Sequence, residues 1–545
     1  MRWSQLPLYW HTLRHLKAQQ FYGRLWQRLP HPSPRNREAP PLRAALQGAW
    51  IRSELRLPSM LGPRRFRFLQ QTHELERAED WNHPHWPKLW LYNLHYFDDL
   101  NAASASTRRA QQEAHIARWI DENPPGQGNG WEPYPCSIRI VNWIKWVANG
   151  QSLTPRALES LALQVRWLEG HLEWHLLGNH LWANAKALFF AGLFFAGREA
   201  DVWREKALAI FAREMPEQVL ADGGHFERSP MYHAILFEDV LDMLNLAAPY
   251  PSTLAPSFVE ELRALARRMA SALAGLVHPD GEIALFNDAA FDIAAPPPAL
   301  FAYAQSLGVQ VSTPSAGLSF LQETGYARVQ LGEALAFLDL APIGPDYLPG
   351  HAHADTLSFE LSLRGERWFV DSGCSLYEPG AERLRQRATA AHNTVEVDGA
   401  DSSEVWSSFR VARRAKVQHI AIAREESSID VAAVHDGYRR LPGKVLHHRR
   451  WSFTAKELLV HDRLQGAFRN ARGACHLHPE VHIETRQGDA LVLKRGEVKM
   501  HLQVEGGDLE VLPSTWHPRF GESLPSRVLR WRFRGRESLL RCQWS

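Results

Sequence analysis

The hydrophobic periodicity of the chain changes once, near residue 310, and this change limits the folds that the chain can adopt. From about residue 100 to 310, apolar residues recur at intervals of three and four, as on the buried face of an α-helix. From about 318 to 545 they alternate in short runs such as "LSFELSL" and "RVLRWRF", as in antiparallel strands. The pattern predicts a helical array followed by a β domain, with a ligand cleft between the two.

Domain boundaries follow from this pattern and from the Pro-rich stretch near residue 295. We expect a less regular leader over 1–90, a helical domain over 91–312 and an antiparallel β domain over 313–545. Short connections between helices favour antiparallel hairpins. The helices are expected over 108–121, 137–149, 155–176, 180–197, 203–218, 230–247 and 256–275.

Charge and cysteine usage argue against several classes of protein. The 62 basic and 60 acidic residues leave a net charge of +2, which does not favour a nucleic-acid binder. The 4 cysteines lie far apart without a CxxC pair, so neither a disulfide framework nor a cysteine-rich metal site is expected. Residues 1–30 lack the apolar core of a signal peptide and resemble a basic amphipathic helix that docks on the protein body. We therefore expect no stable membrane insertion and a cytoplasmic location.

The segment "HAHADTLSFEL" places His351, His353 and Asp355 at every second residue. In an extended segment such side chains point to one face. Asp371 in "FVDSG" and His392 in "AAHNTVEVDG" follow at separations that fit ligands from different strands. Two histidines and a carboxylate form a common ligand set for Zn²⁺ and related cations.

A hairpin turning at Gly365 complicates this metal site, because it places Glu360 opposite Asp371 and leaves His353 far away. The metal site requires the "HAHAD" segment to bend back across the sheet. Asp355 is then a rival ligand, and a hydrogen-bonded polar cluster without metal is the alternative.

Two helix starts in the first half of the chain carry polar side chains. In "LLGNHLWANAK", Gly178 is expected to stop one helix, Asn179 to cap the next and His180 to lie at its start. In "ERSPMYH", Ser229 is expected to cap a helix whose first turn holds Tyr232, where the helix dipole favours a phenolate. One helix separates the two, so both helices begin at the same end of the array. Asn179, His180 and Tyr232 should therefore share one rim, unless they merely cap an interface.

A third segment, "GNGWEPYPCSIRIVNWIKW", offers candidate substrate-binding residues. Arg139 suits a carboxylate or a sulfate, and Asn142 lies on the same predicted helix. Trp131 and Glu132 in the preceding loop are further candidates. Arg139 could equally be a buried structural residue paired with Glu132.

Together, "GNHLWANAKAL", "ERSPMYH", "HAHADTLSFEL", "FVDSG" and "AHNTVEVDG" resemble the heparinase II/III family of polysaccharide lyases. The resemblance covers about residues 90 to 460. It implies an incomplete α/α toroid followed by an antiparallel β-sandwich domain, with the active site in the cleft between them. It also implies β-elimination on an anionic, uronate-containing polysaccharide.

The resemblance also implies a role for each matching residue. Asn179 would hydrogen-bond the uronate carboxylate, and His351 would line the cleft near it. Tyr232 would be the base, and also the acid when the proton and the leaving group lie on one face of the sugar. His180 would be the base on the opposite face or would assist neutralisation. Tyr377 would be a further active-site tyrosine.

His353, Asp371 and His392 match the metal ligands of the family, which hold loops of the β domain in place. The metal would be Zn²⁺, with Mn²⁺ as the alternative. The chain departs from some members at Ala183, where those members carry an acidic residue. Neutralisation of the substrate would then fall to Asn179, His351 or Arg139.

Two other functions stay open on the sequence alone. A glycoside hydrolase would need a pair of carboxylates beside the scissile bond, for which Glu132, Glu227 and Asp222 are candidates. A non-catalytic carbohydrate-binding or exopolysaccharide-assembly protein would keep the fold without the chemistry. The sequence determines neither the polymer nor the oligomeric state.

Overall fold

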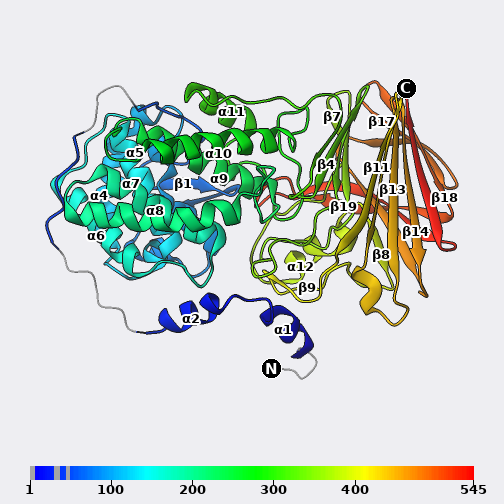
Figure 1. The fold of residues 1–545 in the computed structure, drawn as a ribbon, viewed down its shortest axis with the longest axis horizontal. Coiled ribbons are helices and arrows are strands. Elements are labelled where there is room, and N and C mark those ends of the chain that lie inside the picture. The colour runs from blue at the N-terminus through cyan, green and yellow to red at the C-terminus, as the bar shows by residue number, and fades with distance from the viewer. Residues whose placement is uncertain (1–5, 30–36, 45–49) are drawn as a thin grey trace.

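The computed structural model describes residues 6–29, 37–44 and 50–545, and it places a helical domain end to end with a β-sandwich (Figure 1). The last helix of the helical domain ends at Ser306, and the first strand of the large sheets begins at Gly317. The predicted order, helices first and antiparallel strands second, is confirmed.

The helical domain is built from antiparallel neighbours wrapped around two central helices, α7 (Gly178–Phe194) and α9 (Pro230–Ala247). All residues of α7 except His180, and all residues of α9 except Ile235, are buried. His180 is therefore the residue through which α7 reaches the solvent. Around these two helices lie α3 (Lys88–Tyr96), α4 (Arg109–Glu122), α5 (Pro133–Ala148), α6 (Pro155–Gly170), α8 (Arg198–Gln218), α10 (Pro256–Ala274) and α11 (Pro297–Ser306).

Two large antiparallel sheets form the sandwich, and their facing side chains make one apolar core. The sheet nearer the helical domain contains β5 (Ala334–Asp339) and β6 (Phe359–Leu363), in which every residue is buried. Its other face is covered by the segment between α10 and α11, where Phe286 and Leu276 pack on Phe337. Burial on both faces makes this sheet a rigid platform for loops that reach toward the helices.

The sheet with β5 and β6 runs in the order β19-β20-β15-β7-β6-β5-β4-β3, with β8 beside β15. Its remaining strands are β3 (Gly317–Leu321), β4 (Tyr326–Leu331), β7 (Glu366–Phe369), β8 (Val395–Val397), β15 (Ala471–Leu477), β19 (Gly507–Trp516) and β20 (Leu524–Phe533).

The outer sheet runs in the order β11-β12-β13-β14-β21-β18-β17-β16. Its strands are β11 (Val417–Arg424), β12 (Ser428–His435), β13 (Leu446–Thr454), β14 (Glu457–Gln465), β16 (His482–Gln487), β17 (Ala490–Arg495), β18 (Val498–Glu505) and β21 (Glu537–Trp544). Smaller elements at the domain junction are α12 (Ala381–Arg387), β9 (Val405–Trp406) and β10 (Arg410–Val411).

The described part of the leader contains two short helices, α1 (Leu6–Leu13) and α2 (Ala18–Trp26), and a small hairpin of β1 (Arg65–Phe68) with β2 (Gln71–Glu74). The single helix predicted over 1–30 is thus wrong within the described residues, because the helical conformation is interrupted between Leu13 and Ala18. Thr12 Oγ1 contacts the Val411 carbonyl on β10, and Gln20 donates to the Tyr347 carbonyl. Within 6–29, 37–44 and 50–545, no helix has the length and apolarity that crossing a bilayer requires.

Candidate active site

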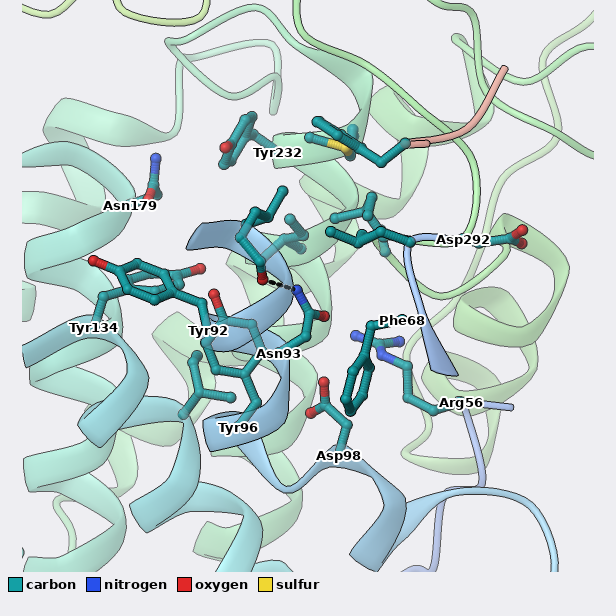
Figure 2. Close-up of a pocket in the computed structure, with 18 of the residues that line it drawn as sticks. Arg56, Phe68, Tyr92, Asn93, Tyr96, Asp98, Tyr134, Asn179, Tyr232 and Asp292 are labelled. Atoms are coloured by element: carbon teal, nitrogen blue, oxygen red, sulfur yellow. Dashed lines mark hydrogen bonds between the residues drawn. The ribbon is translucent and has the colours of Figure 1, made fainter. Parts of the chain in front are cut away.

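A cleft of about 1280 Å³ lies at the junction of the two domains. Helical-domain residues on its wall include Asn179, His180 and Tyr232, and β-domain residues include His351 and Tyr377. Figure 2 shows Asn179 and Tyr232 on the helical side, above tyrosines from α3 and α5. The predicted shared rim of α7 and α9 is confirmed.

Asn179 and His180 lie in the first turn of α7, although not as the sequence predicts. The helix begins at Gly178, and Leu177, rather than Asn179, occupies the position before it. Leu177 and Gly178 both have positive φ, 65° and 54°. A Cβ on Gly178 would lie 2.4 Å from Leu348 Cδ2 and 2.7 Å from Glu227 Oε1. Glycine is therefore required immediately before Asn179.

His180 is held by a buried carboxylate. Its Nδ1 lies 3.0 Å from Glu173 Oε1, and the other oxygen of Glu173 accepts a hydrogen bond from Asn184 Nδ2 at 3.0 Å. Burial opposes protonation of the imidazole, but Glu173 outweighs it, so the pKa of His180 is raised above its usual value. Glu173 therefore favours the positively charged form of His180 at the wall of the cleft.

Tyr232 occupies the first turn of α9, as predicted. Its backbone N–H donates to Ser229 Oγ at 3.2 Å, which confirms the cap. Burial raises the pKa of the Tyr232 phenol well above its usual value, so the expected dominance of the helix dipole is wrong. Desolvation of the charged form is the larger effect, because the side chain is almost fully enclosed. The Tyr377 hydroxyl, 3.1 Å away, opposes this shift.

His351 lies against Tyr232, with a distance of 4.0 Å between the ring centroids. Its Nδ1 is 3.0 Å from Asp288 Oδ2, and its Nε2 is 3.6 Å from Glu227 Oε2. The segment that carries it is an irregular loop, since regular strand structure begins only at Phe359. The prediction of an extended segment is wrong, although His351 and His353 still share one side by both contacting Asp288.

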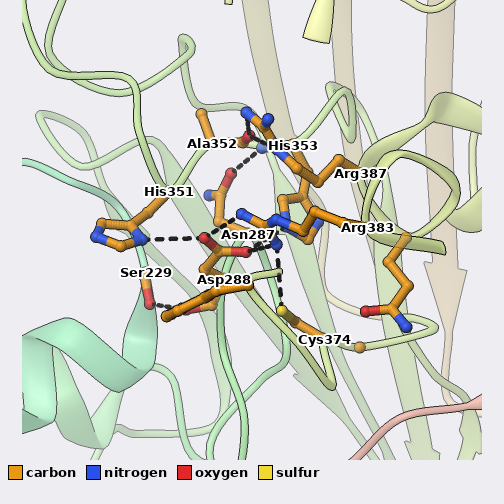
Figure 3. Close-up of polar contacts among 12 residues, drawn as sticks. Ser229, Asn287, Asp288, His351, Ala352, His353, Cys374, Arg383 and Arg387 are labelled. Atoms are coloured by element: carbon orange, nitrogen blue, oxygen red, sulfur yellow. Dashed lines mark hydrogen bonds and ion pairs between the residues drawn. The ribbon is translucent and has the colours of Figure 1, made fainter. Parts of the chain in front are cut away.

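Asp288 is the centre of a polar network that joins the two domains (Figure 3). The guanidinium of Arg383 binds both oxygens of Asp288, with Nη2 2.7 Å from Oδ2. Burial alone would raise the pKa of Asp288, but Arg383 and the two histidines lower it well below its usual value. The Asp288 carbonyl also accepts a hydrogen bond from Ser229 Oγ at 2.6 Å, so one residue fixes both His351 and the cap of α9.

A further buried carboxylate, Glu227, contacts two of the candidate catalytic residues, Asn179 and His351. Its Oε1 accepts hydrogen bonds from the Asn179 side chain at 3.2 Å and from the Asn179 backbone at 3.3 Å. Its other oxygen faces His351. Glu227 thus orients the amide of Asn179, and it was considered from the sequence only as a hydrolase carboxylate.

The substrate contacts predicted for Arg139 and Trp131 are wrong. Arg139 is fully buried, stacks on Trp119 and donates to Gln164 and to backbone carbonyls. Trp131 is 3% exposed, and its indole N–H donates to a carbonyl. Both side chains therefore serve the packing of the helices.

Glu132 and Asn142 differ in whether they line the cleft. Glu132 is absent from the described cleft lining and binds Tyr92 and Lys88 instead of Arg139. Asn142 lines the cleft and donates to Asp98 Oδ1 at 2.7 Å. Of the four predicted substrate-binding residues, Asn142 alone reaches the cleft.

The predicted metal ligands lie close together beneath the cleft. His353, Asp371 and His392 have no exposed surface, and the rings of the two histidines are 5.3 Å apart. His353 Nδ1 and His392 Nε2 are buried without a hydrogen-bond partner. The opposite nitrogen of each ring faces a carboxylate, Asp288 at 2.8 Å and Asp371 at 2.6 Å. This pairing leaves a lone pair on each unpartnered nitrogen, which is the arrangement found in metal-binding histidines.

The carboxylates of this region divide between two roles. Asp371 uses one oxygen for His392 and accepts the Gly373 N–H with the other, at 3.0 Å, so its oxygens are already engaged. Asp355 receives one backbone hydrogen bond, from Asn287. Burial, with repulsion from Asp371 adding to it, raises the pKa of Asp355 to about 6. Among the described residues, Asp288, His353 and Cys374 also bring ligand atoms within 4.8 Å of one another.

Comparison with known proteins shows the family of the chain. The family model described as the heparinase II/III N-terminus matches residues 64–296, and the one described as heparinase II/III-like, C-terminal, matches residues 313–545. The chain belongs to the heparinase II/III family. A crystal structure of heparinase III superposes with a TM-score of 0.67 at 17% identity, covering 98% of this chain and 90% of that one. The heparinase fold, an incomplete α/α toroid followed by an antiparallel β-sandwich, is confirmed.

Two curated relatives carry different names. A heparin-sulfate lyase of Bacteroides stercoris is 27% identical over 301 residues, which cover 51% of this chain and 45% of that protein. The FtsZ-localized protein C of Caulobacter vibrioides is 26% identical over 362 residues, which cover 61% of this chain and 59% of that protein. The match thus spans about half of each relative, and a shared family does not by itself transfer an activity.

Proposed function

We propose that this protein is a polysaccharide lyase that cleaves a uronate-containing polysaccharide by β-elimination. The observation that carries the proposal is the convergence of Asn179, His180, Tyr232, His351 and Tyr377 on one cleft between the domains. The groups available there, an amide, two imidazoles and two phenols, suit proton transfer beside a carboxylate.

The first requirement of elimination is to neutralise the uronate carboxylate, because the C5 proton is only weakly acidic. The Asn179 amide, fixed by Glu227, is positioned to donate to that carboxylate. The positive charge that Glu173 maintains on His180 supplies the electrostatic part. Negative charge that moves onto the carboxylate as C5 loses its proton is stabilised by these two groups.

The second requirement is a path for one proton. Because burial favours the neutral phenol, Tyr232 first releases its proton to solvent in the cleft, and a hydrogen bond from Tyr377 stabilises the resulting phenolate. The phenolate then takes the proton from C5, and the C4–O bond breaks. The same phenol then gives its proton to the departing glycosidic oxygen. A double bond remains between C4 and C5, and Tyr232 is again a phenolate. His351 packs against the ring of Tyr232 and holds it in place.

A divalent cation, Zn²⁺ in the first instance and Mn²⁺ as the alternative, fits beneath the cleft. His353 Nδ1 and His392 Nε2 would hold it with a carboxylate from Asp355 or Asp371. Its contribution is structural, because these ligands fix the loop that carries His351. Asp371 raises the pKa of His392 against the effect of burial, so bound metal competes with a proton and its retention falls as the pH falls.

Metal analysis of purified protein tests this assignment. We expect His353→Ala and His392→Ala to lose the metal and Asp355→Asn to lose it in large part. Asp371→Asn should weaken binding by about 10- to 100-fold, since it orients a ligand. Equal metal content in wild type and His353→Ala would contradict the assignment.

The three carboxylates that the sequence offered for a glycoside hydrolase do not form a pair in the cleft. Glu227 faces the cleft, but Glu132 is engaged with Tyr92. Asp222 accepts hydrogen bonds from the backbone of Glu323 and Thr324 and is absent from the described cleft lining. A non-catalytic assembly protein is the second candidate, because the name of one relative, FtsZ-localized protein C, gives a location and no reaction.

Ultraviolet absorbance of an unsaturated uronate separates these functions. Heparan sulfate, heparin, chondroitin, hyaluronan and alginate are the polymers to test, beginning with the first two because of the names of the relatives. We expect wild type to generate the signal on a uronate polymer and Tyr232→Phe to lose about 10²- to 10⁴-fold of the rate. A polymer that binds without any rise in absorbance would favour the assembly protein.

A further inference from the structure

The charge of the cleft is opposite to the charge expected for a binder of polyanions. Nine carboxylate side chains line it among the described residues, against six lysine and arginine side chains. The six basic residues are Arg56, Arg67, Lys88, Lys145, Lys186 and Arg519. With histidines left out, the wall of the cleft is therefore net negative, and it repels negative charge on a ligand.

The basic residues deep in the cleft are already neutralised. Lys145 lies 3.0 Å from Asp242, and Lys186 lies 2.7 Å from the same carboxylate. Arg56 donates to Glu238 at 2.7 Å. A sulfate that bound one of these cations would have to displace a carboxylate or lie next to it.

Basic side chains at the rim of the cleft are also paired with carboxylates, with one exception. Lys88 pairs with Glu132 at 2.9 Å, and Arg519 pairs with Asp292 and Glu522. Arg67 is the one basic lining residue for which the described part of the chain supplies no carboxylate partner; it donates to Gln70. Unpaired lysine and arginine charge on the described wall is thus limited to Arg67, because His180 and His351, the histidines beside Asn179, also face carboxylates.

Neutral surface occupies much of the remaining wall. Phe68, Tyr92, Tyr96 and Tyr134 are half-buried in the cleft, and Figure 2 shows them below Asn179 and Tyr232. Aromatic rings of this kind offer apolar faces, with hydroxyl groups at their edges, to sugar rings. Such a wall suits uncharged pyranose units on either side of the reacting uronate.

We propose that the cleft accepts a polysaccharide whose uronates are separated by uncharged, unsulfated sugars, and that sulfate groups on neighbouring units are rejected. This inference rests on the proposed function. A single anionic subsite, formed by Asn179 and His180, receives the uronate carboxylate. Specificity then comes from repulsion at the flanking subsites as much as from attraction at the central one.

Binding to Tyr232→Phe tests the inference on heparosan before and after chemical O-sulfation, two polymers that share one backbone. At low ionic strength we expect sulfation to weaken binding by at least about tenfold, with a smaller difference at high salt. Equal or tighter binding of the sulfated polymer would overturn the inference.

A charge reversal at the rim of the cleft provides a second test of the inference. Glu378 is exposed, lines the cleft and has no basic partner among the described residues. Glu378→Lys should improve binding of the sulfated polymer by about threefold or more at low ionic strength. Glu426→Lys, the same change on an exposed turn of the β domain outside the described lining, is the control. No gain beyond that control would also count against the inference.

Wild-type absorbance assays on the same two polymers distinguish the two proposals. Faster elimination on the sulfated polymer would overturn the inference and leave the lyase function intact. Rejection of the sulfated polymer without unsaturated product from any uronate polymer would leave the charge argument standing and remove the lyase function.

Discussion

The helical domain and the domain junction each bury a cluster of charged side chains, and the two clusters differ in what they hold in place. In the helical cluster, Lys186 lies between Asp239 at 2.6 Å and Asp242 at 2.7 Å, while Lys145 also binds Asp242. Lysines and aspartates of neighbouring helices neutralise one another there. Each aspartate has a lysine, and Asp242 has two.

The junction cluster pairs one carboxylate, Asp288, with one guanidinium, Arg383, and the two carboxylate oxygens also contact His351 and His353. Burial lowers the pKa of His353 to about 3, so this ring is neutral and adds no charge. The helical cluster is redundant, whereas the junction cluster depends on a single ion pair. Buried ion pairs thus have two uses in this molecule: those of the helical cluster join neighbouring helices, and the one at the junction orients imidazole rings.

The largest effect should come from Arg383→Met, which leaves Asp288 buried without its counter-ion. We expect the free energy of unfolding to fall by about 3–5 kcal/mol. Lys145→Met should cost less, because Lys186 still neutralises both Asp242 and Asp239. Urea titration of both variants measures the difference in the free energy of unfolding. An equal loss of stability in the two variants would contradict the proposed difference between the clusters.

Asp288→Asn asks whether the junction cluster orients His351. The amide keeps the shape of the side chain but no longer accepts hydrogen bonds at both positions. We expect kcat to fall by about 10²-fold or more while KM changes little. Asp462→Asn is the matched control, because Asp462 is buried between His447 and Arg449 in the sandwich, outside the described cleft lining. A similar fall in kcat in that control would show that the loss reflects stability alone.

Glu173→Gln tests whether a single carboxylate on the helical side controls an imidazole as Asp288 does. The pKa of His180 is raised in the folded protein, so its positive charge is present at lower pH and is lost as the pH rises through that pKa. The substitution should lower the pKa and move the alkaline decline of activity to lower pH. We expect about a tenfold loss at the wild-type optimum. An unchanged pH profile would mean that His180 acts in its neutral form.

The smallest effect is expected for Arg139→Lys. Arg139 is buried and hydrogen-bonded to carbonyls, and no carboxylate among the described residues pairs with it, so it belongs to neither cluster. Stability should fall, but KM of the folded fraction should stay within about twofold of wild type. A large rise in KM would restore the substrate contact that the structure excludes.

The sequence predicted features that depend on local rules. Ser229 and Pro230 mark the start of α9, and helix parity then brings Tyr232 to the same rim as Asn179. The change of periodicity near residue 310 located the transition from helices to sheets. These inferences rely on contacts within one turn or on the direction of whole helices.

Residues that depend on distant partners were missed or misassigned. Asp288 contacts His351 and Arg383, which lie 63 and 95 positions away, and no spacing rule links them. Glu173 was missed because its role requires the fold of the turn before α7. Arg139 was misassigned because a buried guanidinium satisfied by carbonyls has the same sequence signature as one that binds a ligand. The "FND" at 286–288, a polar pair after an apolar run, is the one signal that could have pointed to Asp288.

The hydrogen bond between Tyr232 and Tyr377 joins a helix of one domain to a loop of the other. A rotation that separates the domains by more than the reach of a hydrogen bond removes Tyr377 from the proton carrier. The reacting centre is thus complete only while the two halves of the molecule are docked. Under the proposed function, the two domains must therefore be docked before a bound polymer can be cut.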